Sequence, residues 1–422
     1  MTDTNTTTKA RGSTGLSRRR FTSLLLASGV SAPAILRASG ARATDSVKMA
    51  ALLDLSGGLD IYGRPMLMAM EMAVEEINAT GGLNGKPLEL ITYDTQSNMQ
   101  LYAQYAQQAA LQDQVDLVHG GITSSSREVI RPILNRYNTL YLYSTQYEGG
   151  VCDRNTFCTG TTPAMTSKSP IPYTIDMWGP KFYSIGADYN APRIMSDWSR
   201  TFGEQAGGEQ VANDFFPLNV TEFGALITKI QQARPDFVCS ALIGAAHLGF
   251  YRQWAAAGML SEIPIFSFTF GSGNEHMMLP PEESEGIITP CSYFQEIDSA
   301  LNRDWVSRYH ARYGDDAPYQ NNVSIGGYEG TWLWATAVRN AGTAEREAVI
   351  EAMEAGTSWT GPGGTLTMNA ANHHSSRDIF FGRCTGGAWE PFHTWENQQP
   401  SDTDGRCDLI ANPGQNVQFG AE

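Results

Sequence analysis

Residues 115–129 read VDLVHGGITSSSREV and show the unit from which the chain is built. The apolar run VDLVHG is typical of a buried strand, Gly120 and Gly121 permit a tight turn, and a helical pattern begins at about Ser126. The same alternation is already present from residue 47 onward. Short apolar runs that alternate with helical patterns indicate a parallel sheet with helices on both faces.

Two successive series of such units predict two similar lobes. The strand patterns are VKMAALLDL, LELITYD, VDLVHG and LYLYS in the first series, and FYSIGA, PDFVCSAL and IPIFSFT in the second. We expect an α/β fold of two Rossmann-like lobes with parallel sheets, joined by a multi-strand hinge. The expected lobes comprise residues 44–164 with 297–355, and residues 165–296 with 356–422. Ligands of open α/β sheets bind beyond the carboxyl ends of the strands, so the facing loops are the expected site.

The first 43 residues have the build of an export signal. Arg18–Arg20 precede a modestly apolar run, Phe21–Leu36, and the small-residue pattern Ala41–Ala43 follows it. Paired arginines in this setting indicate the twin-arginine pathway. The apolar run is shorter than the roughly 18 to 20 residues that a membrane span needs. We therefore expect residues 1–43 to be removed and the mature protein to work in the periplasm, without stable insertion in a membrane.

Charge and cysteine content narrow the class of protein further. The net charge of −15 opposes binding to nucleic acid. In an oxidising compartment the cysteine spacing favours two disulfides, one between Cys152 and Cys158 and one between Cys384 and Cys407. Cys239 lies in the apolar run DFVCSAL and is expected to be a buried small hydrophobic residue.

Three loops at the carboxyl ends of expected strands carry the candidate ligand-binding side chains. The first presents the hydroxyls of Thr123–Ser126 beside the exposed N–H groups of a helix start. Ser125 also has Glu128 at the spacing of a capping box, which is the purely structural interpretation of this loop. The second loop offers Tyr143–Tyr147, and the third puts Tyr189 beyond a strand of the other lobe, where a ring suits a flat ligand.

Basic side chains are scarce near these loops. Arg127 and Arg193 are the nearest, and each lies a few residues into a helix, where we expect it to face solvent or a lobe surface. A carboxylate or phosphate ligand usually requires arginine or lysine. The loops therefore favour a small, neutral, polar ligand.

No catalytic motif stands out in the sequence. It has no G-x-S-x-G nucleophile elbow, no H-E-x-x-H zinc motif and no phosphate-binding G-x-x-x-x-G-K. The adjacent His373 and His374 suit a metal less well than a pair four residues apart on a helix, and no acidic cluster accompanies them. We expect no enzyme activity, no metal and no cofactor.

Over nearly all of residues 44–422 the sequence resembles the type I periplasmic solute-binding proteins of ABC transporters, specifically the urea and short-chain amide group. The segments QYEG (146–149), NTFCTG (155–160), DYNAPR (188–193) and LTMNAANHH (366–374) carry this resemblance. The resemblance implies capture of a small-molecule ligand and its delivery to permease subunits in the inner membrane.

The family's ligand contacts, carried over by motif, fall on four positions and one further loop. These are Ser124, Tyr143, Thr145, Tyr189, and the loop at Thr269 and Phe270. The hydroxyls and backbone N–H groups are expected to bind the ligand carbonyl, and Glu275 or backbone carbonyls are expected to accept from its NH2 groups.

Three other functions stay open at this stage. An aliphatic amino-acid carrier on the same fold would use Glu275 for the ammonium group and the hydroxyl loop for the carboxylate. An amide sensor would work inside the cell, which the export signal argues against. An exported hydrolase would need a nucleophile with a matched base, and the sequence offers none.

Overall fold

The structure is a computed structural model that describes residues 46–421. The expected export signal, residues 1–43, lies outside the described residues. None of the helices in the described part combines the length and the apolar character needed to cross a membrane.

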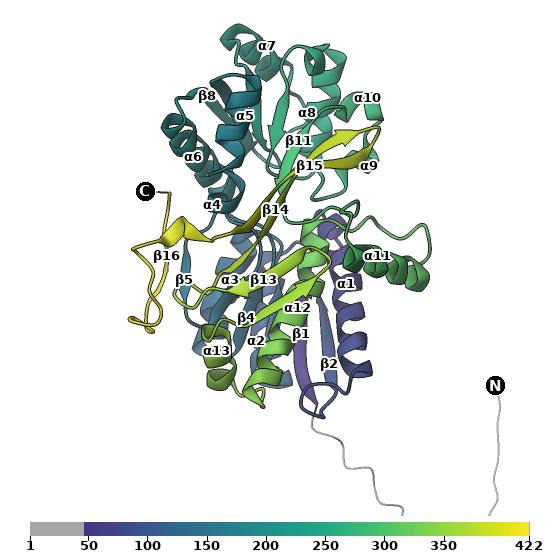
Figure 1. Ribbon diagram of the computed structural model, residues 1–422, viewed down its shortest axis with the longest axis vertical. Helices are drawn as coiled ribbons and strands as arrows, with labels where there is room; N and C mark the ends of the chain where they lie inside the picture. Colours follow the sequence, from purple (N-terminus) through teal and green to yellow (C-terminus); the bar gives the residue numbers. More distant parts are fainter. Residues whose placement is uncertain (1–45, 422) are drawn as a thin grey trace, which may run out of the picture. The chain divides into compact units, whose positions relative to one another are not determined.

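Lobe 1 consists of a five-stranded sheet and five helices (Figure 1). Its strands, in sheet order, are β2 (Leu88–Asp94), β1 (Val47–Leu53), β3 (Leu117–Gly120), β4 (Leu140–Tyr143) and β6 (Thr156–Cys158), and neighbouring strands run parallel. Its helices are α1 (Asp60–Ala79), α2 (Met99–Gln108), α3 (Ser124–Arg136), α12 (Asn322–Ala341) and α13 (Arg346–Glu354).

Alternation along β1 explains why helices cover both faces of this sheet. Met49 and Ala51 belong to a hydrophobic core shared with α1, α12 and α13, whereas Ala50 and Leu52 belong to a core shared with α2 and α3. A strand buried on both faces needs an almost continuous apolar sequence, as VKMAALL is. The predicted α/β class is confirmed.

Lobe 2 contains the second series of strands. Strands β8 (Glu209–Phe216), β7 (Lys181–Ala187), β9 (Phe237–Ala241), β10 (Ile265–Ser267) and β11 (Ile288–Cys291) are neighbours in this order and run parallel. One face packs on α7 (Gly224–Ala233) and α8 (Ala245–Ala256), and the other packs on α5 (Pro170–Trp178) and α6 (Asn190–Gln205). The two lobes therefore share one layered design, and lobe 1 is completed by α12 and α13, which come after the strands of lobe 2 in the chain.

The remaining elements connect or extend the lobes. They are the helices α4 (Pro163–Thr166), α9 (Glu275–Met278), α10 (Pro281–Ser284) and α11 (Ala300–Tyr313), the single turns Ala109–Asp113, Met259–Ser261 and Ser401–Thr403, and the strands β5 (Val151–Asp153), β12 (Ser358–Gly361), β13 (Gly364–Met368), β14 (Ser375–Thr385), β15 (Ala388–Gln398) and β16 (Asn416–Gln418).

Strand β14 passes from one lobe to the other. Its first residues pair with β13, whose Leu366 and Met368 lie in the core of lobe 1, and Phe380–Arg383 pair antiparallel with β11 of lobe 2. Residues 358–368, within the expected second-lobe segment 356–422, thus contribute to the core of lobe 1.

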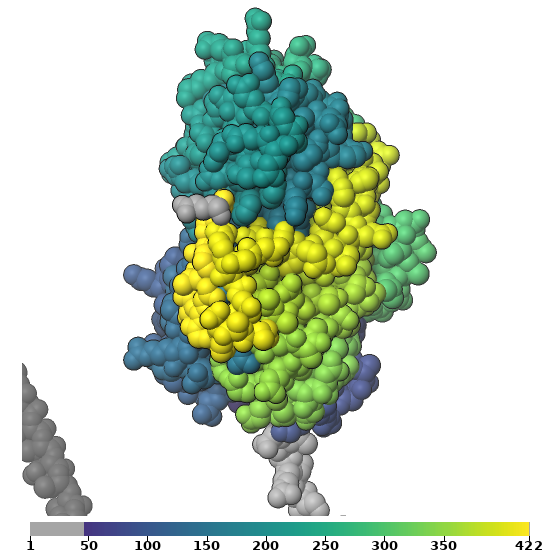
Figure 2. All heavy atoms as spheres, turned by 60° about the vertical axis from the view of Figure 1, so that its left-hand side comes forward, coloured from purple at the N-terminus to yellow at the C-terminus, as the bar shows by residue number. Residues whose placement is uncertain are grey.

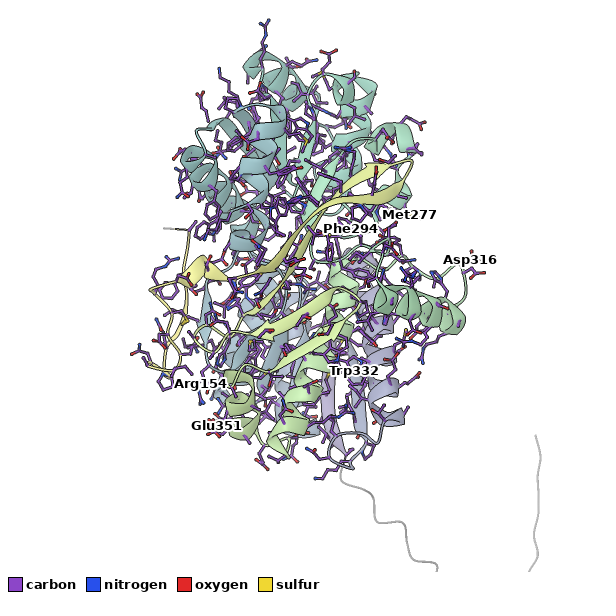
Figure 3. The ribbon with its side chains drawn as sticks, in the orientation of Figure 1. Arg154, Met277, Phe294, Asp316, Trp332 and Glu351 are labelled. Atoms are coloured by element: carbon purple, nitrogen blue, oxygen red, sulfur yellow. A yellow bond between two sulfur atoms is a disulfide. The ribbon has the colours of Figure 1, made fainter. Side chains whose placement is uncertain are left out.

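The C-terminal residues return to lobe 1. Strand β16 pairs antiparallel with β5, and Figure 2 shows the yellow C-terminal segment lying on the surface beside the green residues of lobe 1. Arg154, in the turn between β5 and β6, forms ion pairs of 2.8 Å with Glu347 and Glu354 of α13. Figure 3 shows Arg154 next to that helix.

The disulfide differs from the two that the cysteine spacing suggested. The bond joins Cys152 to Cys407, with a Cα–Cα distance of 5.7 Å, while Cys158 and Cys384 are free and buried. Cys384 lies on β14 in the core of lobe 2, whereas Cys407 belongs to a separate small core with Cys152 of β5. The predicted partner of Cys407 is therefore in a different part of the fold. Cys158 is held within β6, so its position is set by pairing with β4. Cys239 is buried between strand and helix, as predicted.

Candidate ligand-binding site

A cavity of about 50 Å³ lies where the carboxyl ends of strands from both lobes meet. Lobe 1 contributes the start of α1, the loops after β3 and β4, and the start of α12. Lobe 2 contributes the start of α6 and the loops after β9 and β10. The lining residues are Leu59, Tyr62, Ile122, Thr123, Ser124, Thr145, Gln146, Tyr147, Tyr189, Ala191, Pro192, Met195, Ile243, Thr269, Ser272 and Val323.

The glycine turn after β3 brings the first hydroxyl loop to the cavity. Gly120 and Gly121 have φ angles of 153° and 84°, and a Cβ on Gly120 would lie 2.2 Å from the carbonyl oxygen of Leu52. This close approach requires glycine. Thr123 then caps α3: its side chain accepts from the N–H of Ser126, whose own hydroxyl accepts from the N–H of Thr123.

The capping pair is therefore Thr123 with Ser126, and not Ser125 with Glu128. Because Thr123 satisfies the cap, Ser124 is available to line the cavity. The N–H groups of the first helical residues have no partner within the helix. The start of α3 thus offers backbone N–H donors to a ligand carbonyl, whereas the Ser124 hydroxyl donates to the Glu148 carboxylate and can only accept from a ligand.

The second loop supplies Thr145, Gln146 and Tyr147 to the cavity, and Tyr143 supports it from beneath. The Thr145 hydroxyl donates to the carbonyl of Gly121 at 3.1 Å, so its lone pairs stay free to accept. The Tyr143 hydroxyl donates to the carbonyl of Ile122 at 3.2 Å and is buried. Tyr143 therefore positions the first loop and does not line the cavity.

Lobe 2 provides Tyr189 and a mostly apolar wall. Tyr189 precedes α6 and lines the cavity together with Ala191, Pro192 and Met195 from the first turns of that helix. Burial and the nearby Glu148 carboxylate raise the pKa of Tyr189, so its hydroxyl stays protonated at neutral pH. The phenol can therefore donate a hydrogen bond.

The loop after β10 contributes Thr269 and Ser272 but not Phe270. The Thr269 hydroxyl donates to the carbonyl of Leu242 at 2.7 Å. The ring of Phe270 packs edge-on against Tyr251 and Trp389, inside the core of lobe 2.

Glu275 lies behind the cavity wall. Its carboxylate accepts from the N–H groups of Gly271 and Gly273 at 2.8 and 3.0 Å, and from the hydroxyl of Tyr62 at 3.4 Å. Tyr62, which does line the cavity, separates Glu275 from it. Glu275 can therefore act on a ligand only indirectly, through the Tyr62 hydroxyl or through His247, which lies 3.5 Å from its carboxylate and 3.0 Å from the Thr269 hydroxyl.

The two arginines near the loops behave differently. Arg193 pairs with Asp188 at 2.6 Å, and both side chains are partly exposed, which matches the expected surface position. Arg127, by contrast, is fully buried and forms an ion pair of 2.9 Å with the buried Glu148, so the expectation that it faces solvent is wrong. Its guanidinium lies over the rings of Tyr147 and Tyr143, at 4.3 and 5.1 Å from their centroids.

The arginine is buried because Glu148 neutralises it and the two rings cover it. Sequence patterns did not identify Glu148 as a functional residue, although it stands in the QYEG segment. Tyr62 was also not singled out as a ligand contact, whereas Gln146 belongs to the candidate loop Tyr143–Tyr147 but not to the contacts that the family resemblance assigned.

Hydrogen bonds cross between the lobes around the cavity. The Gln146 side chain donates to the carbonyl of Phe268 at 3.1 Å, and Ser272 donates to Asn322 at 3.2 Å. Asn190 donates to Glu148 at 2.9 Å. The described conformation is thus one in which the lobes are closed on the cavity.

The adjacent histidines near residue 373 have separate partners. His373 lies 3.1 Å from Glu354, and His374 bonds to the Tyr147 hydroxyl. Within residues 46–421 no group of three or more His, Cys, Asp or Glu side chains is placed to hold a metal ion.

Two α/β lobes closed over a small cavity at their strand ends define a solute-binding protein. Residues 46–388 match the Periplasmic binding protein family, and the chain belongs to this family. Membership implies a periplasmic location. Members that serve ABC transporters bind small molecules and deliver them to permeases, and the similar proteins below are binding proteins and not enzymes.

Among curated relatives, the chain is similar to the leucine-, isoleucine-, valine-, threonine- and alanine-binding protein of Pseudomonas aeruginosa. The two are 25% identical over 338 residues, which is 78% of this chain and 87% of that protein. This chain is also 22% identical to Leu/Ile/Val-binding protein homolog 7 of Brucella abortus, and the match covers 81% of this chain and 90% of that protein. The chain is thus similar to leucine/isoleucine/valine-binding proteins over most of their length.

Solved structures share the fold. A Brucella ovis leucine-, isoleucine-, valine-, threonine- and alanine-binding protein in a closed conformation superposes with a TM-score of 0.75 at 20% identity, covering 84% of this chain and 97% of that one. An R. palustris solute-binding protein in complex with 4-hydroxybenzoate also superposes with a TM-score of 0.75. The two are 19% identical, and the match covers 84% of this chain and 98% of that one.

Proposed function

We propose that this protein captures urea or a short-chain amide in the cavity between its lobes and delivers it to an ABC permease. The observation that carries the proposal is the combination of a small cavity with a lining that contains no charged side chain. We further propose that the chain reaches the periplasm by the twin-arginine pathway, as its first 43 residues suggest.

The size of the cavity favours a ligand of few atoms. A cavity needs roughly 10 to 15 Å³ of such volume to hold one water molecule. A volume of about 50 Å³ therefore accommodates three to five water-sized groups. Urea and acetamide each have four heavy atoms, whereas leucine and benzoate have nine, so this small volume favours the amides.

The absence of charge in the lining favours a neutral ligand. Arg127 is neutralised by Glu148, and Glu275 lies behind Tyr62, so neither charge reaches the cavity. An amino acid would bring a carboxylate and an ammonium group, and burying each without an opposite charge is costly. A neutral amide needs only hydrogen bonds.

The walls differ in polarity, which favours an aliphatic amide over urea. Ser124, Thr145 and the start of α3 form a polar wall in lobe 1, and Pro192 with Met195 forms an apolar wall in lobe 2. An acetamide molecule can place its amide on the polar wall and its methyl group on the apolar one. Burial of one methyl group stabilises by about 0.8 kcal/mol, so we expect acetamide to bind a few times more tightly than urea.

Isothermal titration calorimetry on the purified mature protein tests the proposal. At a ceiling of about −1.5 kcal/mol per heavy atom, acetamide binding reaches roughly −6 kcal/mol, a dissociation constant of tens of micromolar. Titrations with acetamide, propionamide, urea, leucine, benzoate and 4-hydroxybenzoate separate the candidates. Binding of leucine or of a benzoate, with no heat from any amide, would defeat the amide proposal and favour the ligands named for similar proteins.

A parallel assay addresses the hydrolase alternative. The protein incubated with acetamide should release no ammonia above the rate in buffer. Ammonia release that scales with protein concentration would contradict a pure binding function.

A further inference from the structure

The chain continues beyond the part that matches the family, and its last residues form what we call the C-terminal strap, residues 399–421. The family match ends at residue 388, so the strap lies outside it. The Cys152–Cys407 disulfide and the pairing of β16 with β5 fix the strap to lobe 1. The Asp402 carboxylate also accepts from the N–H of Ala164 at 2.8 Å.

The strap ends at the back of the ligand site. Gln418, the last residue of β16, accepts from the Arg127 guanidinium at 3.0 Å and donates to the Glu148 carboxylate. The same side chain amide therefore contacts both partners of the buried ion pair. Neither partner has an exposed atom in its side chain, so no solvent is available to replace these bonds.

Glu148 links the strap to both walls of the cavity. Its carboxylate also accepts from the hydroxyl of Ser124, which lines the cavity in lobe 1, and from the amide of Asn190, which begins α6 in lobe 2. Asn190 directly follows Tyr189. With Arg127 and Gln418, four donors from three chain segments, α3, the start of α6 and the strap, meet on one carboxylate.

The position of this carboxylate sets two features of the site at once. If it moves, the Ser124 hydroxyl changes its orientation and the Asn190 bond that joins the lobes lengthens. Arg127 alone does not fix it, because a single guanidinium contact of 2.9 Å leaves the carboxylate free to rotate about that bond. Gln418 holds both the arginine and the glutamate and so fixes the pair.

We propose that Gln418 is a positioning residue of the ligand site, and that the disulfide-anchored strap stabilises the closed, ligand-ready arrangement of the lobes through Glu148. The inference rests on the proposal that the cavity is the ligand site. It does not depend on which neutral ligand the cavity takes.

The test compares Gln418→Met with Val417→Ala in the full mature protein. Methionine keeps the length of the side chain and removes both hydrogen bonds, while Val417 neighbours Gln418 on the same strand and is 40% exposed. Loss of a hydrogen bond to a buried charged group predicts a rise of about tenfold in the dissociation constant for acetamide in Gln418→Met. Val417→Ala should leave it unchanged.

Two further measurements separate positioning from general stability. Both ligand-free variants should remain folded at the temperature of the titration, although Gln418→Met should melt somewhat earlier than the wild type because it loses two bonds to a buried ion pair. Hydrogen exchange of the ligand-free protein, followed by mass spectrometry, should be several times faster in Gln418→Met over residues 120–128 and 187–192, and unchanged over α7, which is remote from the strap.

Each outcome decides a specific claim. An unchanged acetamide affinity together with unchanged exchange at 120–128 and 187–192 overturns the role of Gln418. If the wild type does not bind acetamide at all, the proposed function fails, and the exchange data alone decide whether the strap positions the site. In the Cys152→Ser, Cys407→Ser double variant, hydrogen exchange should also become faster over residues 120–128 and 187–192. Exchange as slow as in the wild type would overturn the role of the disulfide as an anchor.

Discussion

Replacement of Tyr189 by alanine should weaken ligand binding by roughly thirtyfold while α6 and lobe 2 stay folded. Tyr189 lines the cavity, and its side chain makes no capping hydrogen bond to α6. Loss of a ring face against a planar amide costs about 1 kcal/mol, and loss of the phenol hydrogen bond costs about 1 kcal/mol more. Together these amount to about 2 kcal/mol, which converts to the stated factor.

Two variants make this prediction sharper. Tyr189→Phe keeps the ring and removes the hydroxyl, so the dissociation constant for acetamide should rise only about fivefold. Tyr137→Ala is the matched control, because Tyr137 is also a half-buried tyrosine at a helix end but does not line the cavity. Calorimetric titration with acetamide measures all three. Equal titration curves for wild type and Tyr189→Ala would remove this residue from the site, and a weakened Tyr137→Ala would show that the effect is not local.

Three other predictions concern the site, the strap and export. Ser124→Ala should raise the dissociation constant for acetamide about fivefold, since one hydrogen bond is lost, and an unchanged value in the same titration would contradict its role. Burial raises the pKa of Asp402 from its ordinary 3.8 to about 6, so the folded state binds this proton more tightly and the stability contribution of Asp402 falls as pH rises from about 4 to about 6. The free energy of unfolding of wild type minus that of Asp402→Asn should therefore drop by about 2 kcal/mol between pH 4 and pH 7 in urea melts, and a difference that does not change with pH would contradict a raised pKa of Asp402. Exchange of Arg18 and Arg19 for lysine should leave the precursor inside the cell when fractions are probed by immunoblot, and normal export would exclude the twin-arginine pathway.

Local patterns were enough to predict the layers of the fold. The run VKMAALL is apolar at nearly every position because β1 is covered on both faces, and the glycines at 120 and 121 mark a turn that a side chain would block. The same patterns placed Ser124, Thr145 and Tyr189 in loops at strand ends, the family resemblance added Thr269, and all four line the cavity. The period of a strand or helix reports which face is buried, and parallel strands necessarily end at the same edge of a sheet.

Contacts between distant segments were beyond such reasoning. The pattern of α3 predicted the helix but put Arg127 in solvent, because its partners Glu148 and Gln418 come from other parts of the chain. Phe270 and Glu275 stand in the expected loop, yet the fold turns one into the core of lobe 2 and puts the other behind Tyr62, more than two hundred residues away in sequence.

The sequence by itself determined the α/β layers, the two lobes and the hydroxyl-rich loops at the strand ends, since each follows from the period and chemistry of neighbouring residues. Only the tertiary structure decided that Cys152 bonds to Cys407, that the Arg127–Glu148 pair is buried, and that no charge reaches the cavity. These features depend on how the lobes and the C-terminal strap pack against each other. Such long-range contacts are formed by the whole fold and leave no periodic mark in the segments that make them.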